Sequence, residues 1–258
     1  MSTQLSLGEW LHTLIPLVRQ AGEAVMNLYD SDLKVREKAD RSPVTAADMA
    51  AEAILVPALE RIDQAIPVVS EEQAETGILP EVGECFWLVD PLDGTKEFIS
   101  RNGEFTINVA LIKAGEPILG VVYAPALDRL FAGAKGLGAF VEEQDTRRSL
   151  HTRQQPNEGL TVVSSRSHGD DDALSGFLRD LPVAQRVSAG SSLKLCLVAA
   201  GEADLYPRLG RTMEWDIAAG DAVLRAAGGA TLTLDGARLL YGKTGFDNPH
   251  FAAWGQCN

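Results

Sequence analysis

Two aspartates follow a short apolar run in the first half of the chain. Residues 86–89 are typical of a buried strand, and they lead into Asp-Pro-Leu-Asp-Gly at positions 90–94. The proline and the glycine predict that the strand ends and turns here, which presents Asp90 and Asp93 at its carboxyl end, where open α/β folds bind ligands. Two carboxylates with the Leu92 carbonyl between them suit Mg²⁺ better than Zn²⁺. A plain solvent-exposed turn is the alternative interpretation.

Further carboxylates follow a second apolar run. Residues 66–70 predict a short strand that ends in Glu71 and Glu72. If this strand lies beside the strand at 86–89, one of the two glutamates lies near Asp90 and Asp93. An exposed Glu-Glu turn is the alternative, and for Glu72 alone we favour it.

Two more aspartates occupy the predicted first turns of helices. Asp216 begins a predicted helix over 213–229 that two glycines end, and Asp48 follows the expected N-cap Thr45 by three residues. A helix dipole favours an anion at either position whether or not the anion has a further role. Position alone therefore leaves both a structural and a functional role open for Asp216 and for Asp48.

The predicted cluster contains four carboxylates, those of Glu71, Asp90, Asp93 and Asp216. Without cations they would repel one another, and some would hold protons. With two Mg²⁺ ions the cluster becomes favourable, and the oxygens of a phosphate ester complete the coordination. Two such ions can align an attacking water with the leaving oxygen. The sequence contains no phosphate-binding P-loop, histidine cluster or nucleophile elbow. Direct attack by water is therefore favoured over a covalent phosphoenzyme.

Hydrophobic periodicity indicates the elements that position these carboxylates. Two amphipathic helices are predicted at the start, followed by an antiparallel meander that reaches residue 141. The polar residues 142–159 predict the domain boundary, so we expect an α+β domain over 1–155. Beyond it, strands and helices alternate and predict an α/β domain over 156–258 that contributes Asp216 and ends with a small hairpin at 231–242.

The composition excludes several classes of protein. The 258 residues have a formal net charge of −13, which opposes binding to a nucleic acid polymer. A chain this acidic needs metal cations to handle a phosphate ester. The three cysteines lack metal-binding or disulfide spacing, and we find no signal peptide or membrane-spanning segment. We expect a cytoplasmic protein; peripheral membrane association at the inner face stays open.

Three separated motifs resemble those of the inositol monophosphatase superfamily, whose members are Mg²⁺-dependent, lithium-sensitive phosphatases. They are Glu-Glu at 71–72, Asp-Pro-Leu-Asp-Gly-Thr at 90–95 and Trp-Asp at 215–216. The similarity extends over nearly the whole chain. The segments 93–99, 102–106, 117–125, 165–168 and 190–194 resemble the bacterial 3'(2'),5'-bisphosphate nucleotidase branch. That branch removes the 3'-phosphate of adenosine 3',5'-bisphosphate (PAP) to give AMP and serves sulfate assimilation.

The resemblance also implies an architecture and roles for single residues. The implied fold is a layered αβαβα sandwich of the α/β class. One Mg²⁺ is implied at Glu71, Asp90 and the Leu92 carbonyl, and a second at Asp90, Asp93 and Asp216. Asp48 and Thr95 are implied as catalytic residues that orient and deprotonate the attacking water. The implied contacts to the substrate, its phosphates included, are Glu71, Leu92, Asp93, Gly94, Thr95, His168, Ser191, Lys194, Arg208 and Asp216.

Two other functions stay open at this point. The first is an inositol or sugar monophosphate phosphatase with the same metal site. Lys194 and Arg208 argue against a monophosphate phosphatase, since they imply a second phosphate on the substrate. The second is a regulatory binding protein without turnover, to which the water-activating residues Asp48 and Thr95 would be of no use. The order of preference between PAP and its sulfated relative PAPS is undetermined, as is the oligomeric state.

Overall fold

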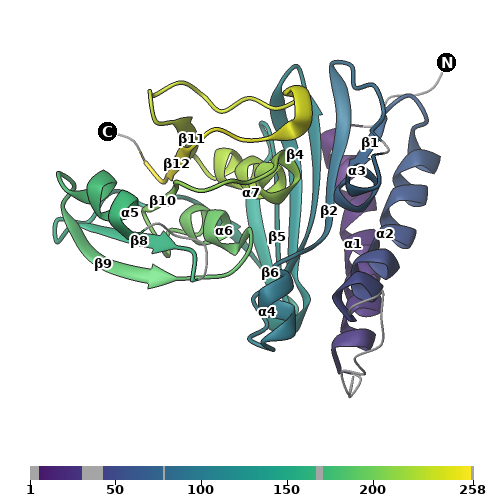
Figure 1. Ribbon diagram of the computed structural model, residues 1–258, viewed down its shortest axis with the longest axis horizontal. Helices are drawn as coiled ribbons and strands as arrows, with labels where there is room; N and C mark the ends of the chain where they lie inside the picture. Colours follow the sequence, from purple (N-terminus) through teal and green to yellow (C-terminus); the bar gives the residue numbers. More distant parts are fainter. Residues whose placement is uncertain (1–5, 31–42, 78, 167–170, 257–258) are drawn as a thin grey trace.

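A computed structural model of the chain describes residues 6–30, 43–77, 79–166 and 171–256. Its regular elements form five layers in the order α–β–α–β–α, which confirms the expected architecture (Figure 1). None of the described helices is long and apolar enough to cross a membrane.

The first two layers are a helix pair and a large sheet. Helices α1 (Leu7–Asp30) and α2 (Pro43–Ile62) pack on each other and on one face of the sheet (Figure 1). The sheet has seven strands in sequence order: β1 (Val68–Ser70), β2 (Cys85–Asp93), β3 (Thr106–Lys113), β4 (Glu116–Ala124), β5 (Arg129–Ala134), β6 (Gly138–Glu143) and β7 (Thr146–Leu150). Strands β1 and β2 are parallel, and each later pair is antiparallel.

The other layers come from the second half of the chain. The five-stranded sheet has the order β11 (Ala230–Thr233), β12 (Phe251–Trp254), β10 (Leu205–Arg208), β8 (Leu160–Ser164) and β9 (Val183–Ser188). Helices α6 (Leu193–Ala199) and α7 (Glu214–Ala226) lie between the two sheets, and α5 (Asp171–Leu178) contributes Leu178 to a small core on the outer face. Short helices α3 (Glu71–Glu75) and α4 (Thr95–Ile99) follow β1 and β2, and 3₁₀ turns occur at Pro125–Leu127 and Thr244–Phe246.

Glycines set α7 directly on the large sheet. A Cβ atom at Gly120 of β4 would lie 2.2 Å from the carbonyl oxygen of Ala219, and one at Gly133 of β5 would lie 2.9 Å from Cα of Val223. Any larger residue at these positions would push the helix away, because buried backbone packed at this distance has no room to yield. The position of α7, and therefore of Asp216 in its first turn, depends on these close contacts.

Local structure differs from the sequence-based expectations at several places. Helix α2 begins at Pro43, so Thr45 is inside the helix and is not its N-cap. Strand β2 does not stop before Asp90 but continues to Asp93, and Pro91 is accommodated where the pairing with β3 shifts register. Glu71 and Glu72 begin helix α3 and are not part of a strand or a plain turn. The polar residues 142–159, predicted as the domain boundary, also contain strand β7, an exposed edge strand that was not predicted. The hairpin expected at 231–242 is present in short form: Leu232 bridges Arg238, and the N–H groups of Thr233 and Leu239 donate to the carbonyl oxygens of Ala237 and Thr231, on the edge of β11 that does not pair with β12.

Candidate active site

Parallel pairing of β1 and β2 brings the first two carboxylates together. Ser70 pairs with Val89, so Glu71, the first residue after β1, lies beside Asp90, the next residue of β2. The register shift between Asp90 and Asp93 adds one residue to β2 relative to β3. A bulge of this kind turns the following side chain, so Asp93 returns to the side of Asp90 and does not point to the opposite face.

Helix α7 supplies the fourth carboxylate from the other side of the sheet. Asp216 is the third residue of α7, and its Oδ2 accepts a hydrogen bond of 2.9 Å from the backbone N–H of Met213. One ligand oxygen each from Glu71, Asp90 and Asp216 lies within 4.8 Å of the others. Asp216 therefore does both things that its sequence position left open: it caps the helix and it points into the carboxylate cluster.

Burial and mutual repulsion make this cluster electrostatically unfavourable without cations. Burial raises the pKa of Glu71 to about 8, with further repulsion from Asp216 and Asp93. The pKa of Asp93 rises to about 7 and that of Asp216 to about 6, in both cases chiefly through burial. Asp90 is also raised well above the ordinary pKa of an aspartate, by burial first and then by Glu71. The cluster must take up protons or bind cations, and its all-oxygen donor set fits a hard divalent ion.

Asp48 lies beside the cluster on α2. It is buried, and burial together with repulsion from Glu72, Glu75 and Glu52 raises its pKa to about 8. The charge of Asp48 also contributes to the raised pKa of Asp90, so the two carboxylates repel each other. The described residues show no hydrogen bond between Asp48 and Thr95, and the implied cooperation of these two residues stays a prediction.

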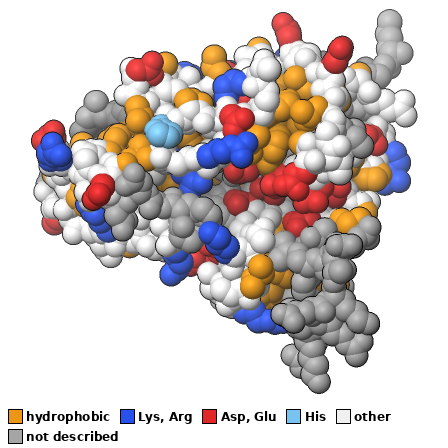
Figure 2. Space-filling model, in the orientation of Figure 1, with side chains coloured by type: hydrophobic (Ala, Val, Ile, Leu, Met, Phe, Trp, Pro, Cys, Tyr) orange, Lys and Arg blue, Asp and Glu red, His pale blue; other side chains and the backbone are white. Residues whose placement is uncertain are grey.

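A cavity of about 370 Å³ opens next to the carboxylates. Asp93 and Asp216 form its acidic wall, while Lys194 and Arg208 line it from α6 and β10. Figure 2 shows acidic side chains gathered in a hollow on this face of the molecule, with Lys and Arg side chains beside them. The predicted substrate residues Gly94, Thr95 and Ser191 also line the cavity, whereas Glu71 and Leu92 are not among its lining residues. Glu71 lies in the carboxylate cluster, and His168 is outside the described residues.

Glycine is required where the chain turns from β2 into α4. Gly94 has φ +95°, and a Cβ atom there would lie 3.2 Å from Cα of Phe105 and 3.3 Å from Cβ of Ser191. A side chain would therefore be strained and would fill the space at the start of α4. Gly94 leaves the backbone of this turn open to the cavity, next to the carboxylate of Asp93.

The basic wall combines the buried Lys194 with the half-buried Arg208, and its hydrogen-bond donors are only partly used. Lys194 is 4 % exposed, and its Nζ donates to the carbonyl oxygens of Ser191 at 2.5 Å and of Ala189 at 3.3 Å. Burial lowers its pKa to about 8, against the opposing attraction of Asp93. Arg208 donates from Nη2 to the carbonyl oxygen of Arg211, but its buried Nε has no hydrogen-bond partner among the described residues. Such a wall favours an anionic group on a ligand.

Sequence reasoning missed a buried chain of hydrogen bonds that supports Asp90. The hydroxyl of Thr106 lies 2.9 Å from that of Ser192, and Ser192 Oγ donates to Asn108 Oδ1 at 2.6 Å. Asn108, which pairs with Asp90 across the sheet, directs its Nδ2 to Asp90 Oδ2 at 3.5 Å. A single sequence carries no signal for this network, because it depends on the register of β2 with β3 and on the approach of α6.

Known proteins with similar sequences and structures cover nearly the whole chain. A profile of the inositol monophosphatase family matches residues 6–255. The 3'(2'),5'-bisphosphate nucleotidase CysQ of Salmonella typhimurium is 46 % identical over 244 residues, which cover 93 % of this chain and 98 % of the relative. The protein with the same name in Escherichia coli K12 is 47 % identical with the same coverage. The crystal structure of CysQ from Bacteroides thetaiotaomicron superposes with a TM-score of 0.82 at 34 % identity, covering 95 % of this chain and 96 % of that one.

Proposed function

The chain belongs to the inositol monophosphatase family, and we propose that it is a Mg²⁺-dependent 3'(2'),5'-bisphosphate nucleotidase that converts PAP to AMP and phosphate. The observation that carries this proposal is a cavity with a carboxylate wall at Asp93 and Asp216 and a basic wall at the buried Lys194 and the half-buried Arg208. The acidic wall suits metal ions with one phosphate group. The basic wall suits a second phosphate, which monophosphate substrates lack.

Each wall has a role in the proposed reaction. Glu71, Asp90, the Leu92 carbonyl, Asp93 and Asp216 would hold Mg²⁺, which supplies Lewis-acid stabilisation of the phosphoryl oxygens when bound. The backbone N–H groups of Gly94 and Thr95 orient the 3'-phosphate. The Asp48 carboxylate accepts the proton of the attacking water, and Thr95 orients that water.

Asp48 is suited to this role by its environment. A proton acceptor works best when its pKa lies near the working pH, and in the protein without metal ions burial beside three glutamates raises the pKa of Asp48 from the ordinary aspartate value to about 8. The free cysteines Cys85 and Cys196 fit a reducing compartment, so the proposal places the reaction in the cytoplasm, where it removes a by-product of sulfonucleotide use.

The proposed function is tested by phosphate release from PAP and from inositol 1-phosphate at equal low concentrations with saturating Mg²⁺. We expect a strong preference for PAP. A preference for inositol 1-phosphate would contradict the nucleotidase while leaving the metal site in place. If the protein turned over neither compound, that result would contradict both the nucleotidase activity and the metal site.

Replacing Arg208 by glutamine is expected to weaken PAP binding selectively. A hydrogen bond to a charged group contributes about 1.5–3 kcal/mol, which corresponds to roughly a 10- to 100-fold rise in KM for PAP. Slow turnover of inositol 1-phosphate should change little, because that substrate has no second phosphate. Steady-state kinetics on both substrates measure the difference, with the exposed Arg179→Gln as the matched control. Equal losses on both substrates would remove Arg208 from the second-phosphate site.

Asp48→Asn is expected to lower kcat by about 10²–10⁴-fold, the usual contribution of a general base. The side chain keeps its size, and we expect metal affinity to change far less than kcat, since Asp48 lies beside the cluster and not within it. Calorimetric titration with Mn²⁺ separates the two effects, and Glu60→Gln on the exposed side of α2 is the control. A parallel loss of metal binding and turnover would show that Asp48 acts as a ligand.

A further inference from the structure

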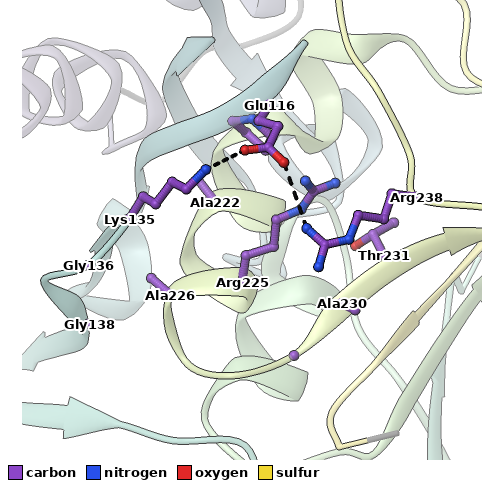
Figure 3. Close-up of a pocket in the computed structure, with 12 residues that line it drawn as sticks. Glu116, Lys135, Gly136, Gly138, Ala222, Arg225, Ala226, Ala230, Thr231 and Arg238 are labelled. Atoms are coloured by element: carbon purple, nitrogen blue, oxygen red, sulfur yellow. Dashed lines mark hydrogen bonds and ion pairs between the residues drawn. The ribbon is translucent and has the colours of Figure 1, made fainter. Parts of the chain in front are cut away.

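A second, larger cavity lies behind α7, away from the candidate active site. Its volume is about 490 Å³, and it is bounded by the start of β4, the turn between β5 and β6, the second half of α7 and strand β11 (Figure 3). It shares no lining residue with the active-site cavity. Arg225 on its wall follows Asp216 by nine residues on the same helix (225 − 216), about 14 Å along the helix axis.

Three cationic side chains converge in this cavity around a single glutamate. Figure 3 shows Lys135, Arg225 and Arg238 directed toward Glu116 from three different segments. Lys135 Nζ contacts Glu116 at 2.5 Å, and Arg238 Nη1 lies 3.7 Å from the same carboxylate. Arg225 is paired with the buried Asp221 at 2.8 Å. Three cations therefore face two carboxylates, a local excess of positive charge in a chain whose net charge is −13.

Several hydrogen-bond donors of the cavity are unused. Thr231 is 1 % exposed, and its buried Oγ1 has no hydrogen-bond partner among the described residues. Thr231 is one of the residues that line the cavity (Figure 3). Arg225 uses Nε and Nη2 for Asp221 and the Leu239 carbonyl, and the described residues offer no partner to its Nη1. Buried hydroxyls are normally hydrogen-bonded, so this one marks an incomplete site.

We propose that this cavity binds a small organic phosphate monoester. The guanidinium groups of Arg225 and Arg238 and the hydroxyl of Thr231 supply donors for the three terminal oxygens of a phosphate group. Arg238 is the mobile member, because its side chain is 74 % exposed and its contact with Glu116 is long; Lys135 continues to neutralise Glu116 when Arg238 turns to the phosphate.

The walls of the cavity define the rest of the ligand. Pro117, Ala222, Ala226 and Ala230 are short and apolar, and glycines complete the lining, so a compact apolar body fits better than a sugar with many hydroxyl groups. A volume of about 490 Å³ exceeds what inorganic phosphate alone needs and falls within the range of small-molecule pockets. The ligand class is therefore a phosphate monoester with a small apolar substituent.

Isothermal titration calorimetry with inorganic phosphate, in the presence of EDTA, tests the proposal. Without divalent cations the carboxylate cluster repels phosphate from the metal-binding wall of the active site. Arg208→Gln weakens any binding at the basic wall of that site, so binding that persists in this variant reports the second cavity. We expect one saturable site per chain with a dissociation constant in the millimolar range or tighter. Phenyl phosphate is expected to bind more tightly than inorganic phosphate, and acetate more weakly.

Two variants and one control assign the binding to this cavity. Arg238→Gln and Thr231→Val are each expected to weaken phosphate binding by about tenfold or more, whereas Arg148→Gln on the exposed strand β7 is expected to change nothing. Valine keeps the β-branched shape, so Thr231→Val removes the hydroxyl without disturbing β11. No saturable binding to the wild-type chain, or unchanged binding in Arg238→Gln, would overturn the proposal. Tighter binding of acetate than of phosphate would overturn the assignment of the ligand class.

Discussion

Replacing Asp93 by asparagine is expected to lower kcat/KM for PAP by at least about 10³-fold while the protein stays folded. Asp93 forms the acidic wall of the active-site cavity together with Asp216 and is the residue that the bulge in β2 turns toward the cluster. An amide has the same shape but no charge, so it would hold a divalent cation poorly. Loss of metal stabilisation worth several kcal/mol corresponds to a loss of this size, because each 1.36 kcal/mol changes a rate tenfold.

The same substitution is expected to leave stability without metal unchanged or improved. Burial and the charge of Asp216 raise the pKa of Asp93 to about 7, so its charged form is unfavourable in the folded protein above that pH. Asparagine removes that cost. Circular dichroism and thermal melts in EDTA check the fold, steady-state kinetics check turnover, and the exposed Asp180→Asn serves as control. Turnover within about tenfold of wild type would contradict the assignment of Asp93 as a metal ligand.

Without divalent cations, the protein is expected to be clearly less stable at about pH 8.5 than at about pH 5.5. In the folded state the pKa values of Asp48, Glu71, Asp93 and Asp216 are raised to about 8, 8, 7 and 6. In the unfolded chain they return to about 4. Between these limits the folded state binds more protons than the unfolded state, so the free energy of unfolding falls as pH rises.

The expected size of this effect is on the order of a few kcal/mol, which corresponds to a fall in Tm of roughly 5–15 °C for a chain of this length. Saturating Mg²⁺ should remove most of the fall, because bound cations replace the protons as counter-charges. Thermal melts at both pH values, with EDTA and with Mg²⁺, measure the fall in Tm with pH and the part of that fall that Mg²⁺ removes.

Variants identify the groups behind the pH effect. Glu71→Gln should make the melting temperature in EDTA less dependent on pH, whereas Glu84→Gln, at an exposed position, should not. Equal melting temperatures at the two pH values in EDTA would show that the cluster is not a source of instability.

Many strands and helices of this protein could be predicted from short stretches of its sequence. The apolar runs before Glu71 and before Asp90 predicted two strands that end in acids, and the structure pairs them in parallel with Ser70 opposite Val89. Periods of hydrophobic residues predicted the long helices and the alternation of the second half, because these signals depend only on neighbours along the chain. The layered αβαβα architecture came from the family resemblance of three short motifs and is confirmed.

What failed at the sequence level depends on partners that are distant along the chain. Pro91 and Gly94 indicated a strand end, but pairing with β3 carries β2 through a bulge to Asp93. The segment 231–242 forms the expected hairpin only briefly, at Leu232 and Arg238, and the longer pairing of β11 is with β12, which comes almost twenty residues later. Strand β7 was not predicted because its residues are polar: an edge strand exposed on both faces has no apolar alternation.

The sequence by itself determined which residues can do the chemistry, because carboxylates, glycines and cations are needed for metal and phosphate whatever the fold. Only the tertiary structure decided how they meet. Glycine contacts at Gly120 and Gly133 place α7 so that Asp216 reaches Glu71 and Asp90. The same placement of α7 against β4 and β11 creates the second cavity. Arg225 and Thr231 line this cavity but do not belong to one sequence motif. Register and packing distance, which arise from contacts between remote segments, are the physical quantities that a single sequence does not display.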